Sequence, residues 1–291
     1  MTTIGFIGLG AMGLPMARNL VTRGFTVRGF DMRQAAVEAL AKAGGVRAAS
    51  AGEASAGADV LVLMVVNAAQ AETILFSNGA LAALPENGIV VLVATCPPGA
   101  VEKIAARVLE AGRRFVDAPV SGGGVGAESA NLTIMAAAPQ ATVEAVQPVL
   151  DALGDKVFHV GEKPGQGAMV KTVNQLLCGV HIAVTAEALS LAAKVGVDLA
   201  VMLNILSGPS ASSWMLKNRG PRMLQAEPEV TSAVDIFVKD LGFVLETGRD
   251  VKAALPLAAL AHQMFLAVSG QGGGNDDDSQ VIRAYQALNA R

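Results

Sequence analysis

A lysine and two amide side chains stand close together on one predicted helix. Lys171, Asn174 and Gln175 occupy positions i, i+3 and i+4 of a helical pattern that we expect to run from about Gly167 to Val195. Side chains at this spacing share one face of a helix. A neutral lysine can accept a proton from an alcohol and its ammonium form can return it, so this face is typical of general acid–base chemistry on a polar ligand. Taken alone, however, Lys171 could simply be solvated at the start of a helix.

The same helix carries a regular apolar stripe, whose residues are Val170, Val173, Leu177, Val180, Val184, Ala188, Leu191 and Val195. Steps of three and four residues indicate one buried face, so we expect this stripe to lie in the core. At about 1.5 Å per residue the helix would span roughly 40 Å, enough to join two domains. Gly165 and Gly167 at its start have no side chain, so another segment or a ligand could approach the backbone closely there. The N–H groups of the first turn favour a bound anion.

The N-terminal segment has the pattern of a dinucleotide-binding turn. A predicted strand from Thr3 to Gly8 leads into G-x-G-x-x-G, a helix follows from Met12 to Arg23, and a second strand ends at Asp31. The glycines permit a tight turn and let a pyrophosphate reach the backbone, while a carboxylate at this distance binds the adenosine ribose. We therefore predict a nicotinamide cofactor, with contacts from Gly8, Leu9, Gly10, Ala11, Met12, Gly13, Asp31, Met32 and Arg33.

Asp31 and Arg33 bear on the choice between the two nicotinamide cofactors. A carboxylate at the ribose would repel a 2′-phosphate, so Asp31 favours NAD over NADP. Arg33 could lie over the adenine or meet a phosphate, so NADP is not excluded.

Strands alternate with helices over the rest of the first half. We expect strands near Val46 and over residues 59–66, 88–94, 114–118, 132–138 and 157–160. This alternation predicts an α/β fold with a doubly wound parallel sheet of the Rossmann type. Asn67 and Thr95 directly follow two of these strands, and Val66 ends the first of them. Open α/β sheets bind ligands at these ends, so we expect all three residues to contact the cofactor. Asn67 is equally well suited to capping a helix.

A serine and a run of glycines follow the predicted strand over residues 114–118. Ser121, Gly122 and Gly123 would expose one hydroxyl and several backbone N–H groups. Such groups can hold a carboxylate without a full positive charge, although a plain flexible loop is the alternative.

The C-terminal half is helical almost to its end. We expect an NAD-binding domain over residues 1–162 and an all-helical substrate and oligomerisation domain over residues 163–291. The acids of the segment 275–279 are expected to cap the last helix. Because 52% of the residues are hydrophobic, we also expect the helical domain to form a homodimer or homotetramer.

The composition argues against several classes of function. A net charge of −3 gives no basic field, which disfavours a nucleic-acid partner. The histidines show no ligand spacing, so no metal site is expected. Cys96 and Cys178 lie far apart in the sequence, which fits a reducing compartment. No secretion signal and no apolar run long enough to span a bilayer is evident, so we expect a cytoplasmic protein without a membrane partner.

Four motifs, in order along the chain, resemble the motif set of the β-hydroxyacid dehydrogenases. They are FIGLGAMGLPMARNL, FVDAPVSGG, GQGAMVKTVNQ and VKDLG. The resemblance spans the whole chain and implies a Rossmann domain, a helical domain joined to it by the long helix, and an active site in the cleft. It implies that Lys171 is catalytic. The other implied contacts are Ser121, Gly122, Gly123, Asn174 and Gln175 to the substrate, and Thr95 and Lys239 to the cofactor.

Finer features are similar to the L-threonate dehydrogenase branch of that family. They are VNAAQ, LLCGVHIAVTAEAL, SSWMLKNR and SAVDIFVKDLG. Ser212, Ser213 and His181 would hydrogen-bond extra hydroxyl groups of a sugar acid. The resemblance therefore implies NAD-dependent oxidation of a small hydroxy acid, such as the four-carbon acid L-threonate. 3-Hydroxyisobutyrate dehydrogenase and tartronate semialdehyde reductase are the alternative activities, and the presence of Lys171 argues against a non-enzymatic protein of the same fold.

Overall fold

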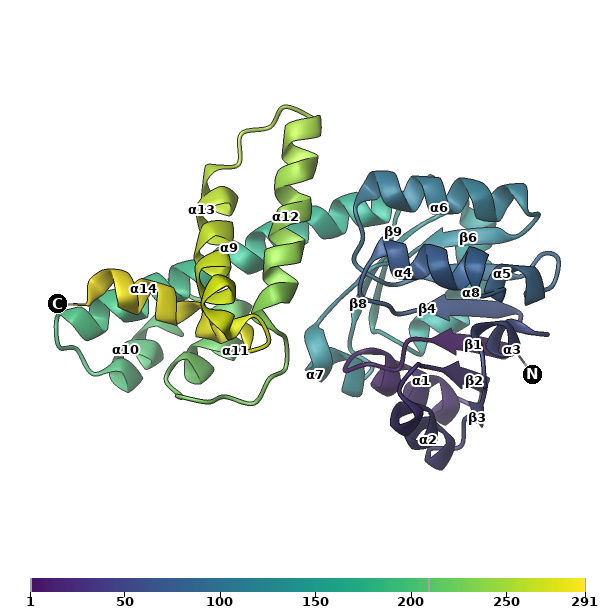
Figure 1. Ribbon diagram of the computed structural model, residues 1–291, viewed down its shortest axis with the longest axis horizontal. Coiled ribbons are helices and arrows are strands. Elements are labelled where there is room, and N and C mark those ends of the chain that lie inside the picture. The colour runs from purple at the N-terminus through teal and green to yellow at the C-terminus, as the bar shows by residue number, and fades with distance from the viewer. Residues whose placement is uncertain (1, 209, 291) are drawn as a thin grey trace. The chain divides into compact units, whose positions relative to one another are not determined.

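The computed structural model describes residues 2–208 and 210–290. The chain forms two compact units, Met1–Lys171 and Thr172–Arg291. In Figure 1 the first unit is coloured from purple to teal and contains the sheet, while the second continues from teal to yellow and is helical. The functional division after residue 162 stays a prediction.

The first unit is built on one mixed sheet. Its strands are β1 (Thr3–Ile7), β2 (Thr26–Phe30), β3 (Val46–Arg47), β4 (Val60–Leu63), β5 (Ile89–Leu92), β6 (Arg114–Asp117), β7 (Val120–Ser121), β8 (Thr133–Ala137) and β9 (Lys156–Gly161). Their order is β3-β2-β1-β4-β5-β6-β8-β7, with β9 paired to β8. The strands from β3 to β6 in this order are all parallel, as expected for a Rossmann sheet.

The far end of the sheet departs from the expected parallel arrangement. Strand β8 runs antiparallel to both β6 and β7. Parallel neighbours need a crossover of a dozen or more residues, usually a full helix. The segment between β7 and β8 holds only the short helix α7 (Gly123–Glu128), so the chain turns back instead.

Helices cover both faces of the sheet. They are α1 (Gly13–Thr22), α2 (Gln34–Lys42), α3 (Ala51–Ser55), α4 (Ala68–Glu72) with the π-helical η1 (Thr73–Ser77), α5 (Ala80–Ala83), α6 (Pro98–Glu110) and α8 (Gln140–Asp151). Alternate strand residues serve opposite cores: Val60 and Val62 pack with α1, α2 and α8, whereas Leu61 and Leu63 pack with α3, α5 and α6. Because both faces are covered, the central strands β4 and β5 are apolar at every position.

The second unit consists of helices around one core. They are α9 (Gln166–Lys194), which begins in the first unit, α10 (Leu199–Leu206), α11 (Trp214–Met223), α12 (Val234–Asp250), α13 (Pro256–Val268), η2 (Ser269–Gly273), η3 (Asp278–Val281) and α14 (Ile282–Asn289). Side chains of α9, α12, α13 and α14 form the core. Stacked rings of Phe237 and Phe265, with centroids 5.2 Å apart, join α12 to α13.

The prediction that the apolar stripe of α9 is core was wrong. Val173 is 59% exposed and Leu191 is 60% exposed. The buried face instead contains Ile182, Ala183 and Ala186. Helix α9 is apolar on nearly every side, so periodicity alone could not decide between two stripes. The buried stripe combines small residues with the fully buried Ile182 and Leu189, and its small residues let neighbouring helices approach closely.

Helix α9 also corrects the expectation that no apolar segment is long enough to span a bilayer. Its most apolar window has a mean hydropathy of 1.7, and half of that window is buried inside the protein. The core helix of a soluble protein has the same length and composition, so this feature is weak evidence for a membrane segment.

The acids of the segment 275–279 do more than cap a helix, contrary to expectation. Asp277 accepts the N–H of Ser279 at the start of η3, but its Oδ2 also pairs with Arg222 Nη1 at 2.7 Å. Both carboxylate oxygens of the fully buried Asp278 accept N–H groups of Arg219, each at 2.8 Å. These ion pairs fasten α11 to η3.

Candidate active site

The turn between β1 and α1 requires glycine at two positions. Gly8 has φ +94°, and a Cβ there would lie 2.1 Å from the Met64 oxygen. A Cβ at Gly13 would lie 1.8 Å from the Gly8 oxygen. At Gly10, by contrast, the nearest heavy atom to an added Cβ is Arg33 Nη2 at 3.8 Å, so the backbone there is open to a ligand. Leu9, Ala11 and Met12 fill the positions between these glycines.

Asp31 directly follows β2 and points its carboxylate at this turn. Its Oδ2 accepts the Leu9 N–H at 2.7 Å, and its Oδ1 accepts the Arg33 N–H at 2.8 Å. Burial by itself raises the pKa of Asp31, but the hydrogen bonds from Arg33 and Leu9 outweigh it and hold that pKa below its usual range. The carboxylate is therefore ionised at neutral pH.

Arg33 lies across the same turn, whereas Met32 is almost fully exposed. The Arg33 Nε is 3.2 Å from Asp31 Oδ1, and Nη2 donates to the Leu9 oxygen at 3.0 Å. The Arg33 side chain is 65% exposed. A guanidinium thus stands beside the carboxylate that is expected to meet the ribose.

Other predicted cofactor residues follow β4 and β5. These parallel strands neighbour β1, so their carboxyl ends lie at the same edge of the sheet. Asn67 Oδ1 accepts the Gln70 N–H at 2.9 Å, and Gln70 Oε1 accepts the Val66 N–H at 3.0 Å. The side-chain oxygen of Asn67 therefore caps α4, which is the alternative that the sequence left open. Thr95 is half-buried just after β5.

The serine–glycine segment is the start of a helix rather than a flexible loop. Ser121 ends β7, and α7 begins at Gly123. Gly122 has φ +134° and Gly123 has φ +63°, which other residues rarely adopt. A Cβ on Gly123 or Gly124 would meet nothing within 4 Å. The backbone here is uncovered, as a carboxylate-binding segment requires.

Asp117 holds the start of α9, and we did not single it out from the sequence. It ends β6, is 1% exposed, and its Oδ2 accepts the N–H groups of Gly165 and Ala168, each at 2.9 Å. The first turn of α9 does attract an anion, but that anion is the protein's own carboxylate. A Cβ on Gly167 would lie 2.5 Å from the Met135 oxygen, so glycine is needed where α9 meets the sheet.

The predicted acid–base residue follows one turn later. Lys171 is 6% exposed, Asn174 is half-buried and Gln175 is 8% exposed. Gln175 Nε2 donates to Asp240 Oδ2 at 2.6 Å, and Lys239 Nζ lies 3.0 Å from Asp240 Oδ1. The sequence predicted that Lys171, Asn174 and Gln175 share one helix, and the extent of α9 confirms this. Asp240 lies in the VKDLG motif, but its contact with Gln175 was not predicted.

Ser213 and His181, which were expected to meet the hydroxyl groups of the substrate, make contacts within the helical unit. Ser213 Oγ accepts the Leu216 N–H at 3.0 Å and caps α11. His181 is half-buried, and its backbone oxygen accepts a hydrogen bond from the Thr185 hydroxyl. Within residues 2–208 and 210–290, no cluster of three or more His, Cys, Asp or Glu side chains could hold a metal.

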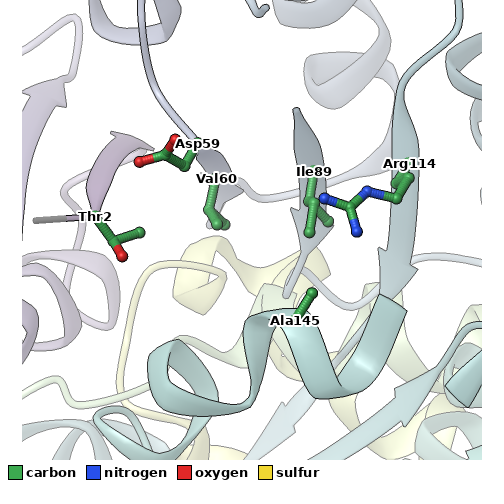
Figure 2. Close-up of a pocket in the computed structure, with 6 residues that line it drawn as sticks. All are labelled: Thr2, Asp59, Val60, Ile89, Arg114 and Ala145. Atoms are coloured by element: carbon green, nitrogen blue, oxygen red, sulfur yellow. The ribbon is translucent and has the colours of Figure 1, made fainter. Parts of the chain in front are cut away.

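A cavity of about 390 Å³ lies at the opposite, amino edge of the sheet. Figure 2 shows its lining residues, Thr2, Asp59, Val60, Ile89, Arg114 and Ala145. Asp59 accepts the Thr3 N–H at 2.8 Å, and Arg114 donates to the Asn87 oxygen at 3.0 Å, so both side chains already have hydrogen-bond partners within the fold. The predicted cofactor residues follow the carboxyl ends of the strands and take no part in this cavity.

Comparisons with known proteins identify the family of this chain. Residues 3–161 match the family model of the NAD binding domain of 6-phosphogluconate dehydrogenase, and residues 165–285 match that for the NAD-binding of NADP-dependent 3-hydroxyisobutyrate dehydrogenase. L-threonate dehydrogenase of Cupriavidus necator is 44% identical over 98% of this chain and 96% of its own length. The chain belongs to the β-hydroxyacid dehydrogenase family.

Other members of this family are similar over the same length. 2-(Hydroxymethyl)glutarate dehydrogenase of Eubacterium barkeri is 37% identical over 98% of this chain and 95% of its own length. A crystal structure of 3-hydroxyisobutyrate dehydrogenase from Salmonella typhimurium has a TM-score of 0.92 and 38% identity, covering 97% of this chain and 99% of that one. The fold and family expected from the four motifs are thereby confirmed.

As a β-hydroxyacid dehydrogenase the chain is an NAD(P)-dependent oxidoreductase that acts on hydroxy acids. The first unit fits such a cofactor. The open backbone at Gly10 and the start of α1 would receive the pyrophosphate, and the ionised Asp31 would receive ribose hydroxyls.

The buried Asp117 predicts a pH dependence of stability. Burial raises its pKa to about 6, against the lowering effect of N–H groups from Ala168, Gly165 and Gly167, whereas the ordinary value is 3.8. Protonation therefore stabilises the fold fully below pH 3.8, and this stabilisation is lost as the pH rises through about 6. A shift of about two pKa units corresponds to roughly 3 kcal/mol.

We expect Asp117→Asn, which keeps an acceptor oxygen without a charge, to lack this loss. Urea denaturation of both proteins between about pH 3.5 and 7 measures the difference in their free energies of unfolding. The exposed Asp151→Asn serves as the control and should follow the wild-type profile. Parallel profiles for wild type and Asp117→Asn would contradict the assignment.

Proposed function

We propose that the protein oxidises a four-carbon sugar acid such as L-threonate with NAD. The observation that carries this proposal is the 44% identity, over almost the full length of both chains, to an L-threonate dehydrogenase. The buried Lys171 on α9 and the uncovered glycine segment after β7 support it chemically.

The proposed mechanism assigns one task to each group of residues. The bound cofactor would supply the hydride acceptor. Lys171 Nζ would take the proton of the substrate hydroxyl, for which the amine must be neutral, and would return it in the reverse reaction. The Ser121 hydroxyl and the N–H groups of Gly122 and Gly123 would hold the substrate carboxylate. Asn174 would orient the hydroxyl that reacts.

3-Hydroxyisobutyrate dehydrogenase activity is the second candidate, because the Salmonella structure that carries this name is similar at a TM-score of 0.92. Tartronate semialdehyde reduction is a third. Cofactor reduction should be measured with L-threonate, glycerate, 3-hydroxyisobutyrate and 6-phosphogluconate. We expect the highest kcat/KM with L-threonate, and a preference for 3-hydroxyisobutyrate would overturn the proposed substrate.

We also propose that the enzyme is a cytoplasmic homo-oligomer. Cys96 and Cys178 are both thiols, which supports a reducing cytoplasm. The exposed stripe on α9, with Val173, Leu177 and Leu191, supports a homodimer or homotetramer because soluble monomers rarely expose contiguous apolar surface of this kind.

Replacing Lys171 and Ser121 should impair different kinetic constants. Lys171→Ala removes the proton acceptor and should lower kcat by roughly a hundredfold to ten-thousandfold while NAD still binds. Ser121→Ala removes one hydrogen bond to a charged group, worth about 1.5–3 kcal/mol, and should mainly raise KM. Steady-state kinetics and calorimetry of NAD binding separate the two effects.

Lys194→Ala is the control on the same helix, because Lys194 lies in the last turn of α9 and donates to the Asn289 oxygen. It should turn over at the wild-type rate. If Lys171→Ala also does so, the proton leaves by another route and the mechanism is wrong.

Asp31 should set the cofactor preference. We expect the wild type to prefer NAD, and Asp31→Ala to lose about tenfold or more in kcat/KM for NAD because ribose hydrogen bonds to a carboxylate are lost. In that variant Arg33 is released from its ion pair and should improve the use of NADP. Kinetics with both cofactors measure this, with Met32→Ala as the control at a nearby exposed position. A wild-type preference for NADP would assign Arg33 to the 2′-phosphate instead.

The exposed stripe of α9 should mediate self-association. Leu191→Lys places a charge on this stripe and should lower the mass measured by light scattering at micromolar concentration. Leu109→Lys on α6, where the side chain is 52% exposed, should leave the mass unchanged. A monomeric wild type would refute the proposed oligomer.

A further inference from the structure

Three polar side chains meet in the helical unit: two are buried, and that of Lys239 is 21% exposed. Asp240 on α12 is 3% exposed and Gln175 on α9 is 8% exposed. The Gln175 amide donates to Asp240 Oδ2 at 2.6 Å, and the Lys239 ammonium lies 3.0 Å from Asp240 Oδ1. A buried carboxylate thus joins an amide from one helix to an ammonium from another.

A close contact between α9 and α12 brings these groups together. Gly179 lies one helical turn after Gln175, and a Cβ there would be 2.8 Å from Leu241 Cδ2. Leu241 follows Asp240 directly and is fully buried. Because glycine lets the Leu241 side chain press against the α9 backbone, the neighbouring pair at positions 175 and 240 can reach hydrogen-bonding distance.

Asp240 differs from the buried carboxylate that serves structure in the same unit. Both oxygens of Asp278 accept directed N–H groups from Arg219 at 2.8 Å. Among the residues that the structure describes, Asp240 Oδ1 receives no directed hydrogen bond, and its contact with Lys239 is an ion pair between sequence neighbours. Side chains at i and i+1 of a helix do not face each other, so Lys239 must fold back to make this contact.

Such a partly satisfied buried carboxylate costs stability. Local costs of this kind are expected at functional sites rather than in a purely structural core. The two partners of Asp240 are also the residues that the family resemblance assigns to substrate and cofactor, respectively.

We propose that Asp240 is a positioning residue that fixes both the substrate-side amide of Gln175 and the cofactor-side ammonium of Lys239. This proposal rests on the proposed hydroxy acid dehydrogenase function. Oδ2 holds the carboxamide of Gln175 in one orientation, and Oδ1 holds the Lys239 ammonium in place. One carboxylate therefore sets the place of two binding groups without touching either ligand.

The test is Asp240→Asn, which keeps the shape of the side chain and removes its charge. Its new amide NH₂ opposes either the Gln175 NH₂ or the Lys239 ammonium. We expect the Kd for NADH, measured by fluorescence titration, and the KM for the hydroxy acid each to rise about 10- to 100-fold, the usual worth of a hydrogen bond to a charged group. Asp278→Asn is the matched control and should lower the thermal midpoint while leaving both constants of the folded protein unchanged.

A double-mutant cycle distinguishes positioning from general damage. If Asp240 acts on the substrate through Gln175, the KM effects of Asp240→Asn and Gln175→Ala will be less than multiplicative in the double variant. The double variant Gln175→Glu with Asp240→Asn restores a carboxylate–amide hydrogen bond between the helices. Its KM should be lower than that of Asp240→Asn alone.

Two outcomes would overturn the proposal: fully multiplicative effects in the cycle, or a folded Asp240→Asn whose NADH Kd and substrate KM stay within about twofold of wild type. If Asp240→Asn does not fold, Gln175→Met tests the substrate side and Lys239→Met tests the cofactor side. An unchanged substrate KM in Gln175→Met together with an unchanged NADH Kd in Lys239→Met would refute the proposal. The NADH titration needs no turnover, so a wild type that oxidises none of the hydroxy acids would refute the proposed function but leave the cofactor arm measurable.

Discussion

The start of α9 depends on a buried carboxylate at the end of β6. Asp117 accepts the N–H groups of Gly165, directly before α9, and of Ala168 in its first turn, and Gly167 lets that turn press against the sheet. The helix dipole and the unpaired N–H groups make this a favourable place for a negative charge, although burial costs enough to raise the pKa of Asp117 to about 6. Lys171 follows one turn later, so the position of the proposed acid–base residue is set by this contact.

The same helix has two apolar sides, one buried and one exposed. Small residues such as Gly179 and Ala186 face the interior of the helical unit, where they allow close packing and bring Gln175 to Asp240. Larger residues such as Leu177 and Leu191 remain exposed. Hydrophobicity alone does not decide which side is buried, since the large residues Ile182 and Leu189 are fully buried while Leu191 is exposed.

Sequence reasoning succeeded where the determining interactions are local. The turn at Gly8 and Gly13, the acid at Asp31 and the extent of α9 all follow from short-range backbone geometry and spacing. It failed where residues distant in the chain meet. Nothing in the sequence around Asp117 or Asp240 indicates that each would lie against α9, and the all-round apolar character of α9 hid which face is core.

The short connection from β6 to β7 links the position of Ser121 to that of Asp117. Asp117 and Ser121 are separated by a short stretch in which Ala118 and Val120 are buried, and Lys171 belongs to the same compact unit. Asp117 therefore fixes the positions of both Lys171, proposed to take the proton, and Ser121, proposed to hold the substrate carboxylate. Because protein interiors are closely packed, the positions of these two residues relative to each other can vary little. A substitution that loosens Asp117 would misalign both ends of the substrate at once.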